Sequence, residues 1–390
     1  MGPLKELKVL DLSRVLAGPY ATMMMADFGA NVYKIEPPKV GDDSRAFGPF
    51  VGKESAYYMS LNRNKRSMVL DFKKQSNIDV FKEMVKNADV VVENYKPGTM
   101  EKFGIGYDVL KEINPKIIYA ACSGFGHTGP YKEKPAYDII VQAMGGIMSI
   151  TGQEGGEPTR VGASVGDVFA GIFTAYAIML AVYHREKTGE GQKIDVAMLD
   201  CQVAILENAI ARYVTSGDVP KPIGNRHPSI TPFASYTAKD GFVIVGAGND
   251  RLWEKLCTTI DRMDLFKHPK FDTNPNRTQN VKELAVELNK TLKEKTIAEW
   301  ITILEAVGVP CAPINTIDKI VNDPQIKARE MIVEVEHPVA GKLKMPNVPF
   351  KMSKTPGGVT APAPLLGQHT NELLNEMFGW DAATVEEKLK

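Results

Sequence analysis

Apolar and polar positions in residues 1–125 alternate between short, uninterrupted apolar runs and amphipathic stretches. Such runs are typical of strands buried on both faces of a parallel sheet, and the amphipathic stretches are typical of helices. The expected strands are residues 7–12, 31–36, 68–72, 88–92 and 116–121, and the expected helices are residues 19–28, 78–87 and 99–113. A doubly wound, mostly parallel sheet is the economical assembly, because right-handed crossovers cover both of its faces.

The pattern changes in the second half of the chain. A long apolar stretch without proline predicts a helix over residues 167–185, followed by a strand over 192–196 and a helix over 199–213. Glycine, proline and polar residues then cluster in residues 216–232, as is typical of a domain boundary.

The segment beyond this boundary predicts a smaller α+β domain. Its expected elements are hairpin strands over residues 233–237 and 242–245 and helices over 251–259, 280–293 and 296–306. The proline-rich segment from Met331 onward is expected to form strands and extended chain that return to the first domain. We therefore expect a large domain of residues 1–215, completed by 330–390, and a small domain of residues 225–325.

Composition agrees with a large enzyme of two domains, since 390 residues exceed what one core usually serves. Lys+Arg and Asp+Glu number 47 each, which argues against nucleic acid or an anionic membrane as a partner. The four cysteines are widely spaced and form no zinc pattern, so we expect reduced thiols and no metal. The N-terminal residues have no signal-peptide pattern and we find no apolar stretch long enough to span a bilayer, so we expect a cytoplasmic location.

Asp167 is the strongest candidate for chemistry, because it follows Gly166 and directly precedes the long apolar helix. A carboxylate at or near a helix N-terminus is expected to stay ionised, and it can serve as a nucleophile. Gly166 and Gly171 lack side chains, which would let a large substrate approach closely. The competing interpretation is a purely structural N-cap, a position that Asp favours.

A nicotinamide-dependent dehydrogenase is the rival interpretation of the first βαβ unit, with Glu36 as the acid that binds ribose. The glycine fingerprint that this requires is missing, since the chain has Leu16-Ala17-Gly18-Pro19 at that place. We therefore expect no nicotinamide cofactor. Ser123-Gly124 follows a strand, but no G-x-S-x-G motif supports a hydrolase.

Several motifs occur in order along the chain and together resemble the class III CoA-transferase family, which includes formyl-CoA, carnitine and 2-hydroxyacyl CoA-transferases. The resemblance extends from about Leu7 to Thr370. The motifs are residues 9–19 (VLDLSRVLAGP), 62–67 (NRNKRS), 92–98 (VENYKPG), 123–126 (SGFG), 136–138 (AYD), 166–167 (GD) and 188–192 (TGEGQ). The resemblance implies a Rossmann-like large domain, a smaller second domain and an interlocked homodimer.

The resemblance also implies which residues contact CoA. They are Leu16, Ala17, Pro38, Leu70, Asp71, Phe72, Lys73, Asn94, Tyr95, Lys96, Lys102, Pro135, Ala136, Tyr137 and Asp138. Leu16 replaces a glutamine of the formyl-transferring members and Pro38 replaces an arginine, so formyl or oxalyl specificity is not implied. Lys39 and Arg45 are candidates to supply the missing positive charge.

A glycine loop that shields intermediates in the family aligns with Gly224, Asn225, Arg226 and His227. This chain has one glycine there, so the mobility of the loop is not implied, and Asn225 and His227 are candidates to contact the acyl carboxylate.

The chemistry implied is transfer of CoA from an acyl-CoA to a free carboxylic acid, through aspartyl anhydride and aspartyl-CoA thioester intermediates on Asp167. Coenzyme A then enters as part of the substrate, with no metal. One alternative is an α-methylacyl-CoA racemase, a relative that has histidine where this chain has Tyr137, and a neutral tyrosine is a poor base for Cα proton abstraction. The other is a nonenzymatic acyl-CoA-binding protein, against which the intact Gly166-Asp167 pair argues.

Overall fold

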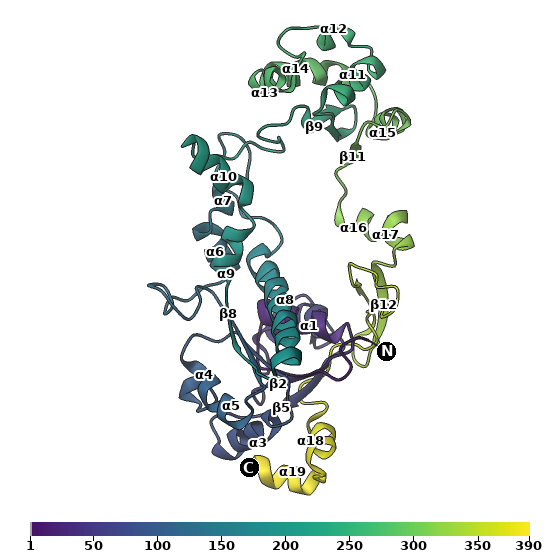
Figure 1. Cartoon of the computed structure of the whole chain (residues 1–390). Helices are drawn as coiled ribbons and strands as arrows, with labels where there is room; N and C mark the ends of the chain where they lie inside the picture. Colours follow the sequence, from purple (N-terminus) through teal and green to yellow (C-terminus); the bar gives the residue numbers. More distant parts are fainter. Residues whose placement is uncertain (1) are drawn as a thin grey trace. The chain divides into compact units, whose positions relative to one another are not determined.

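The computed structural model describes residues 2–390, and these form two compact units (Figure 1). Unit 1 comprises the residues up to Ile147, Arg160–Gly217 and Pro324–Lys390, and unit 2 comprises Met148–Thr159 and Asp218–Asp323. Residues 148–159, which the sequence pattern placed in the large domain, thus belong to unit 2. They are tied there by Gly224 N–H, which donates to Gly152 O at 2.9 Å, and by an ion pair of 2.7 Å between Arg226 and Glu154.

Unit 1 is built on a six-stranded sheet in which every neighbouring pair is parallel. The strands, in their order across the sheet, are β5 (Arg66–Val69), β2 (Asn31–Glu36), β1 (Lys8–Asp11), β6 (Val90–Glu93), β7 (Ile118–Ser123) and β8 (Lys193–Ala197). The chain builds outward from β1 in one direction, returns to β6 and builds outward in the other. The expectation of a mixed α/β fold with a parallel sheet is confirmed.

Helices cover both faces of this sheet, as Figure 1 shows for α1 and α8 on one side. Alternate residues of β1 supply the two faces: Val9 packs in the layer that contains Met25 and Ile178, and Leu10 packs in the layer that contains Phe81. The helices of the first layer are α1 (Ala17–Ala26) and α8 (Val165–Thr188), and those of the second are α3 (Gln75–Val85), α5 (Tyr107–Ile113), α18 (Thr370–Phe378) and α19 (Ala382–Leu389). The C-terminal segment therefore returns to unit 1 with two helices as well as extended chain.

Two expected helices of unit 1 are each broken in two. The stretch 99–113 forms α4 (Thr99–Lys102) and α5, because Gly104 adopts a left-handed φ of 69° between them. The stretch 199–213 forms α9 (Met198–Ala204) and α10 (Glu207–Ser216). The remaining elements of unit 1 are a 3₁₀ turn at Asp43–Ala46, β3 (Phe50–Val51), β4 (Glu54–Ser55), α2 (Ala56–Leu61), α6 (Asp138–Met144), α17 (Pro324–Ala328), β12 (Ile332–His337) and β13 (Gly341–Pro346). Helix α7 (Ile147–Ile150) begins at Ile147 of unit 1 and continues into unit 2.

Unit 2 has an antiparallel sheet of three strands, β11 (Cys311–Pro313), β10 (Gly241–Gly246) and β9 (Phe233–Ala238). Its own core contains the fully buried Trp253 and Leu288. Its helices are α11 (Asp250–Thr259), α12 (Met263–Phe266), α13 (Asn274–Gln279), α14 (Val281–Leu292), α15 (Ile297–Ala306) and α16 (Ile317–Ile320).

Helix α8 is long and apolar enough to cross a membrane, judged by length and composition alone. The expectation that the chain lacks such a stretch was therefore wrong. Ile178 and Ala181 of α8 are buried against the sheet, as in the core helix of a soluble protein. Tyr176, Leu180 and Tyr183 of the same helix are 61%, 52% and 67% exposed, so α8 presents an apolar face that unit 1 does not cover.

Candidate active site

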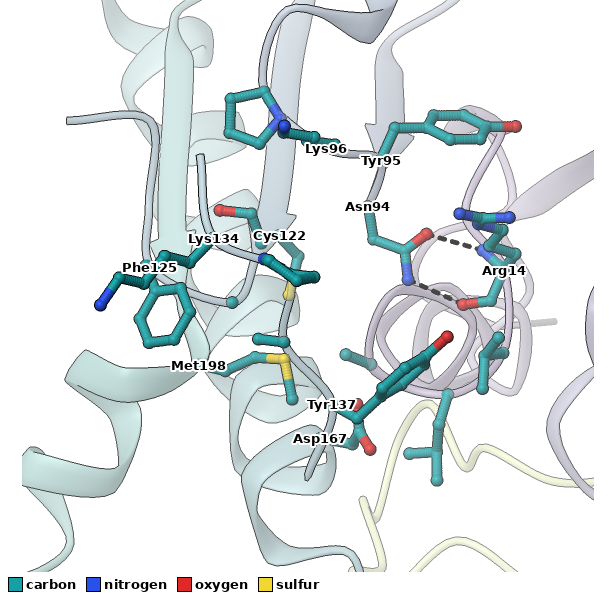
Figure 2. A pocket seen from close by; sticks show the side chains of 18 of the residues that line it. Arg14, Asn94, Tyr95, Lys96, Cys122, Phe125, Lys134, Tyr137, Asp167 and Met198 are labelled. Carbon is teal, nitrogen blue, oxygen red and sulfur yellow. Dashed lines mark hydrogen bonds between the residues drawn. The ribbon is translucent and has the colours of Figure 1, made fainter. Parts of the chain in front are cut away.

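A cavity in unit 1 lies at the carboxyl ends of β1, β6 and β7 (Figure 2). Residues 14–17 follow β1 and residues 94–97 follow β6, and both segments line it. The strands β1 and β6 are neighbours at which the winding of the sheet reverses, and open α/β sheets bind ligands at such a switch point. The other residues of the lining are Asp43, Cys122, Ser123, Gly124, Phe125, Lys132, Lys134, Pro135, Ala136, Tyr137, Asp167 and Met198.

Asp167 lies in the first turn of α8 and lines this cavity. The N-cap of α8 is Ser164, so the interpretation of Asp167 as a structural N-cap is wrong. No hydrogen bond or ion pair joins the Asp167 carboxylate to another of residues 2–390. Asp167 therefore places an unpaired carboxylate on the cavity wall.

The environment of Asp167 favours its protonated form. Burial, together with the smaller effect of the negative charge of Asp138, raises the pKa of this carboxyl to about 7, and Arg160 partly opposes the shift. We had expected the helix N-terminus to keep the group fully ionised, and removal from water outweighs that effect. A carboxylate with a raised pKa is a stronger base and nucleophile than an ordinary one once it is ionised.

Asp138 holds the backbone next to Asp167. Its Oδ1 accepts a hydrogen bond of 2.9 Å from Gly166 N–H, and its Oδ2 accepts bonds of 2.9 Å from Gln142 and 3.0 Å from Arg160. Asp138 is only 7% exposed and its carboxylate is occupied by these donors, so it serves to fix the turn that presents Asp167.

The glycines beside Asp167 allow close packing of α8 on its neighbours. A Cβ on Gly166 would lie 2.6 Å from Val141 Cγ2, and one on Gly171 would lie 2.8 Å from Ala17 O. Protein atoms, and not open substrate space, adjoin both positions. The expectation that these glycines make room for substrate was therefore wrong.

Two tyrosines lie near Asp167. Tyr137 is 74% exposed, precedes α6 as its N-cap residue and lines the cavity. Tyr57 of α2 was not expected here, since no motif marks it. Burial, with a smaller effect of the charge of Asp167, raises the pKa of Tyr57 to about 12, so the Tyr57 hydroxyl is within electrostatic reach of the nucleophile candidate.

The predicted CoA-binding residues fall into two groups. The cavity lining includes Leu16, Ala17, Asn94, Tyr95, Lys96, Pro135, Ala136 and Tyr137. It does not include Pro38, Leu70, Asp71, Phe72, Lys73, Lys102 or Asp138. Contact of this second group with CoA stays a prediction, as does the role of Gly224, Asn225, Arg226 and His227, which belong to unit 2.

The positive charges at the cavity differ from those expected. Lys132 and Lys134 line it beside Lys96, and their signal in the sequence is the lysine-rich stretch YKEK just before Pro135. Arg45 is not free to replace the arginine absent at Pro38, because its Nε and Nη2 donate to Glu36 at 2.7 and 2.8 Å. The same pairing occupies Glu36, the candidate ribose ligand of the dehydrogenase interpretation.

Cysteine chemistry finds little support at this cavity. Burial raises the pKa of Cys122, which lines it, to about 12, so the group remains a thiol at neutral pH. Within residues 2–390, no cluster of three or more His, Cys, Asp or Glu side chains is arranged to hold a metal ion.

Comparison with known proteins agrees on one family. The family model described as CoA-transferase family III matches residues 4–370. Succinyl-CoA:glutarate CoA-transferase of Homo sapiens is 40% identical over 388 residues, which cover 99% of this chain and 89% of that protein. Succinyl-CoA:mesaconate CoA-transferase of Haloarcula marismortui is 42% identical over 402 residues, 98% of each chain. A solved CAIB/BAIF family protein from Brucella suis has a TM-score of 0.87 at 38% identity and covers 96% of this chain and 99% of that one.

Proposed function

The chain belongs to CoA-transferase family III, as its motifs indicated, and from this premise we propose that it transfers CoA between small dicarboxylic acids through covalent intermediates on Asp167. The observation that carries the proposal is the unpaired Asp167 carboxylate on the wall of a cavity at the switch point of the sheet. The succinyl-CoA-dependent relatives support succinyl-CoA as the donor and a dicarboxylate such as glutarate as the acceptor.

The first half-reaction loads CoA onto the enzyme. An oxygen of Asp167 attacks the thioester carbonyl carbon, the C–S bond breaks, and a mixed anhydride and CoA thiolate form. The thiolate then attacks the aspartyl carbonyl of the anhydride and releases the donor as a free carboxylate. The product is an aspartyl-CoA thioester on Asp167.

The second half-reaction reverses these steps with the acceptor. The acceptor carboxylate attacks the aspartyl thioester carbon and expels CoA thiolate, which gives a second anhydride. The thiolate attacks the acyl carbonyl of that anhydride, so the new acyl-CoA leaves and the Asp167 carboxylate is restored. We propose Tyr137, which lines the cavity, and Tyr57, whose hydroxyl feels the charge of Asp167, as donors to the tetrahedral oxyanions. We propose Lys96, Lys132 and Lys134 as the cations for the CoA phosphates.

We also propose that the chain acts as a homodimer. The exposed side chains of Tyr176, Leu180 and Tyr183 on α8 form the apolar surface that such an interface requires. Light scattering coupled to size-exclusion chromatography is expected to give twice the chain mass of 42.9 kDa.

Trapping tests the chemistry directly. Wild-type protein is incubated with succinyl-CoA and then hydroxylamine, and peptide mapping is expected to locate a hydroxamate on Asp167. Glutarate labelled with ¹⁸O in its carboxylates is expected to leave one label on Asp167 after turnover. A hydroxamate elsewhere, or no label on Asp167, would show that the nucleophile is another group.

A second arm separates transfer from racemisation. A chiral 2-methylacyl-CoA incubated in D₂O is expected to keep its Cα hydrogen and its optical purity. Deuterium uptake at Cα, with no CoA exchange across a panel of acids, would instead assign Asp167 as a general base.

A further inference from the structure

The backbone polar groups of the loop Ser13–Val15, between β1 and α1, are not bound within a helix or a sheet. Side chains bind these groups instead, and most of these side chains come from distant positions in the sequence. Asp11 accepts from Ser13 N–H, and Asn94 accepts from Arg14 N–H at 2.8 Å and donates to Arg14 O at 2.7 Å. Figure 2 shows the two bonds between Asn94 and Arg14 as dashed lines.

Lys34 and Asp42 complete this set. Lys34 Nζ donates to Ser13 O, and Asp42 Oδ1 accepts from Val15 N–H at 3.0 Å. The two side chains form an ion pair of 2.7 Å, and both are fully removed from solvent. Five consecutive backbone polar groups, from Ser13 N–H to Val15 N–H, are thereby bound by side chains.

The conformation held in this way is strained. Val15 has a φ of 65°, in the left-handed region that a β-branched residue strongly disfavours. Leu16, the N-cap of α1, makes no side-chain capping bond that could fix the turn. The bonds of Lys34 to Ser13 O and of Asp42 to Val15 N–H lie on either side of the two Arg14–Asn94 bonds. They oppose a change of Val15 to an ordinary φ.

The loop has a direct bearing on the cavity, because Arg14, Val15 and Leu16 are part of its wall together with Asp167. Relaxation of Val15 to an ordinary φ would reorient the peptide planes on both sides and move that wall. A displacement of about 1 Å at a reacting centre can reduce a rate about a hundredfold.

We propose that the buried Lys34–Asp42 ion pair is a positioning device, which holds Val15 in its left-handed conformation and thereby sets the wall of the acyl-CoA site. Neither residue touches substrate. The kinetic consequences rest on the proposed function, whereas the conformational ones do not.

The test variant is Asp42→Asn. The amide cannot both accept from Val15 and Ser44 and face Lys34 without placing its own NH₂ against the ammonium group. The matched control is Asp27→Asn, which breaks another buried ion pair of unit 1, that between Asp27 and Arg63 at 2.6 Å. Neither Asp27 nor Arg63 lines the cavity, so the control removes a buried charge without touching the loop.

Hydrogen–deuterium exchange and CoA binding are the readouts that do not depend on turnover. In Asp42→Asn, exchange is expected to accelerate in a peptide that covers residues 12–17, and the affinity for free CoA by calorimetry is expected to fall. In Asp27→Asn, that peptide and the affinity are expected to stay at the wild-type level even where the melting temperature falls equally. Equal changes in both variants would reduce Asp42 to a structural residue and overturn the proposal.

Kinetics and rescue give the second readout. Asp42→Asn is expected to lower kcat/KM for acyl-CoA by about tenfold to a hundredfold. Adding Val15→Gly to Asp42→Asn is expected to raise kcat/KM again by about threefold or more, because glycine adopts the left-handed conformation without side chains that hold it there. Strictly additive effects of Asp42→Asn and Val15→Gly on kcat/KM would contradict the proposal that the Lys34–Asp42 ion pair holds Val15. If the wild-type protein transferred no CoA, the proposed function would fail, and the exchange and binding results would still decide the role of Asp42.

Discussion

Unit 1 withdraws carboxylates from water in two contrasting settings. Beside the loop Ser13–Val15, Asp11 and Asp42 are 0% and 3% exposed. Burial opposes their ionisation, yet Lys65 and Lys34 hold the pKa of each below its usual value. On the cavity wall, Asp167 has no such cation in contact, and burial raises its pKa to about 7. Burial is common to these three carboxylates, and the lysine partners of Asp11 and Asp42 account for the difference in the direction of the pKa shift. The paired carboxylates bind the backbone of the loop Ser13–Val15, and the unpaired one is the group that we propose as the nucleophile.

The largest effect is expected from removal of the reactive carboxylate. Asp167→Ala is expected to lower kcat by about 10⁴-fold or more, the scale seen when a covalent nucleophile is lost. CoA binding and the far-ultraviolet circular dichroism spectrum are expected to stay unchanged. Asp79→Ala, an exposed residue of α3, is the control. Turnover of Asp167→Ala close to that of the control would contradict covalent catalysis on Asp167.

The next effect concerns stability, where a change at the paired carboxylates is expected to matter more than a change at Asp167. Lys65 donates to Asp11 at 3.0 Å and to Asn62 at 2.9 Å, entirely out of solvent. Lys65→Met leaves Asp11 with one cation fewer and is expected to lower the free energy of unfolding by about 3–5 kcal/mol. Asp167→Asn is expected to cause no loss, because it removes a carboxylate without a partner.

Urea denaturation measures both stability changes. Lys86→Met is the control, since the ion pair of Lys86 with Glu83 is half exposed and is expected to contribute less than about 1 kcal/mol. A loss for Asp167→Asn equal to that for Lys65→Met would remove the distinction between the two settings.

A smaller effect is expected in the pH profile. Only ionised Asp167 attacks the thioester, so kcat/KM is expected to rise about tenfold per pH unit below the pKa of about 7 and to level off above it. Asp138→Asn removes the negative charge that favours the protonated form of Asp167, so the rising limb is expected to move to lower pH. Asp79→Asn is expected to leave the limb in place. A limb that moved to higher pH in Asp138→Asn would show that the anchoring of Gly166 outweighs the charge.

The parallel sheet and the position of Asp167 in the first turn of a long apolar helix could be predicted from the sequence, because both depend on local signals. Apolar runs such as residues 88–92 mark buried strands, and Gly166-Asp167 directly precedes an unbroken apolar helix. The break at Gly104 was missed because an isolated glycine is compatible with a helix as well as with its end.

The electrostatics of the site could not be predicted in the same way, because they arise from residues that only the fold brings together. Asp42 meets Val15 from 27 residues away, and Lys65 meets Asp11 from 54. The motif 62–67 gave no indication that Lys65 is buried against Asp11, and the raised pKa of Asp167 depends on its burial and on the charge of Asp138 of another helix. Periodicity locates elements, and it does not show which charges face one another.

The smallest effect is expected from the lysines that we propose bind the CoA phosphates without taking part in the chemistry. Lys96 lines the cavity, and its ion pair with Glu133 at 3.2 Å is more than half exposed, so a phosphate can replace that partner. Lys102, at the end of α4, is not part of the lining. Phosphates are bound equally in the ground and transition states, so Lys96→Ala is expected to raise KM for acyl-CoA about three- to tenfold with kcat nearly constant.

Lys102→Ala is expected to raise KM less than Lys96→Ala, and Lys111→Ala, on the exposed side of α5, is the control. The order of the KM values of Lys96→Ala, Lys102→Ala and Lys111→Ala decides whether the CoA phosphates bind beside Lys96 in the cavity or beside α4. An effect of Lys102→Ala larger than that of Lys96→Ala would place the phosphates beside α4, outside the present lining. A fall in kcat in place of a rise in KM would instead assign Lys96 to the reacting end of the substrate, and the division between binding charges and the reactive carboxylate would then have to be redrawn.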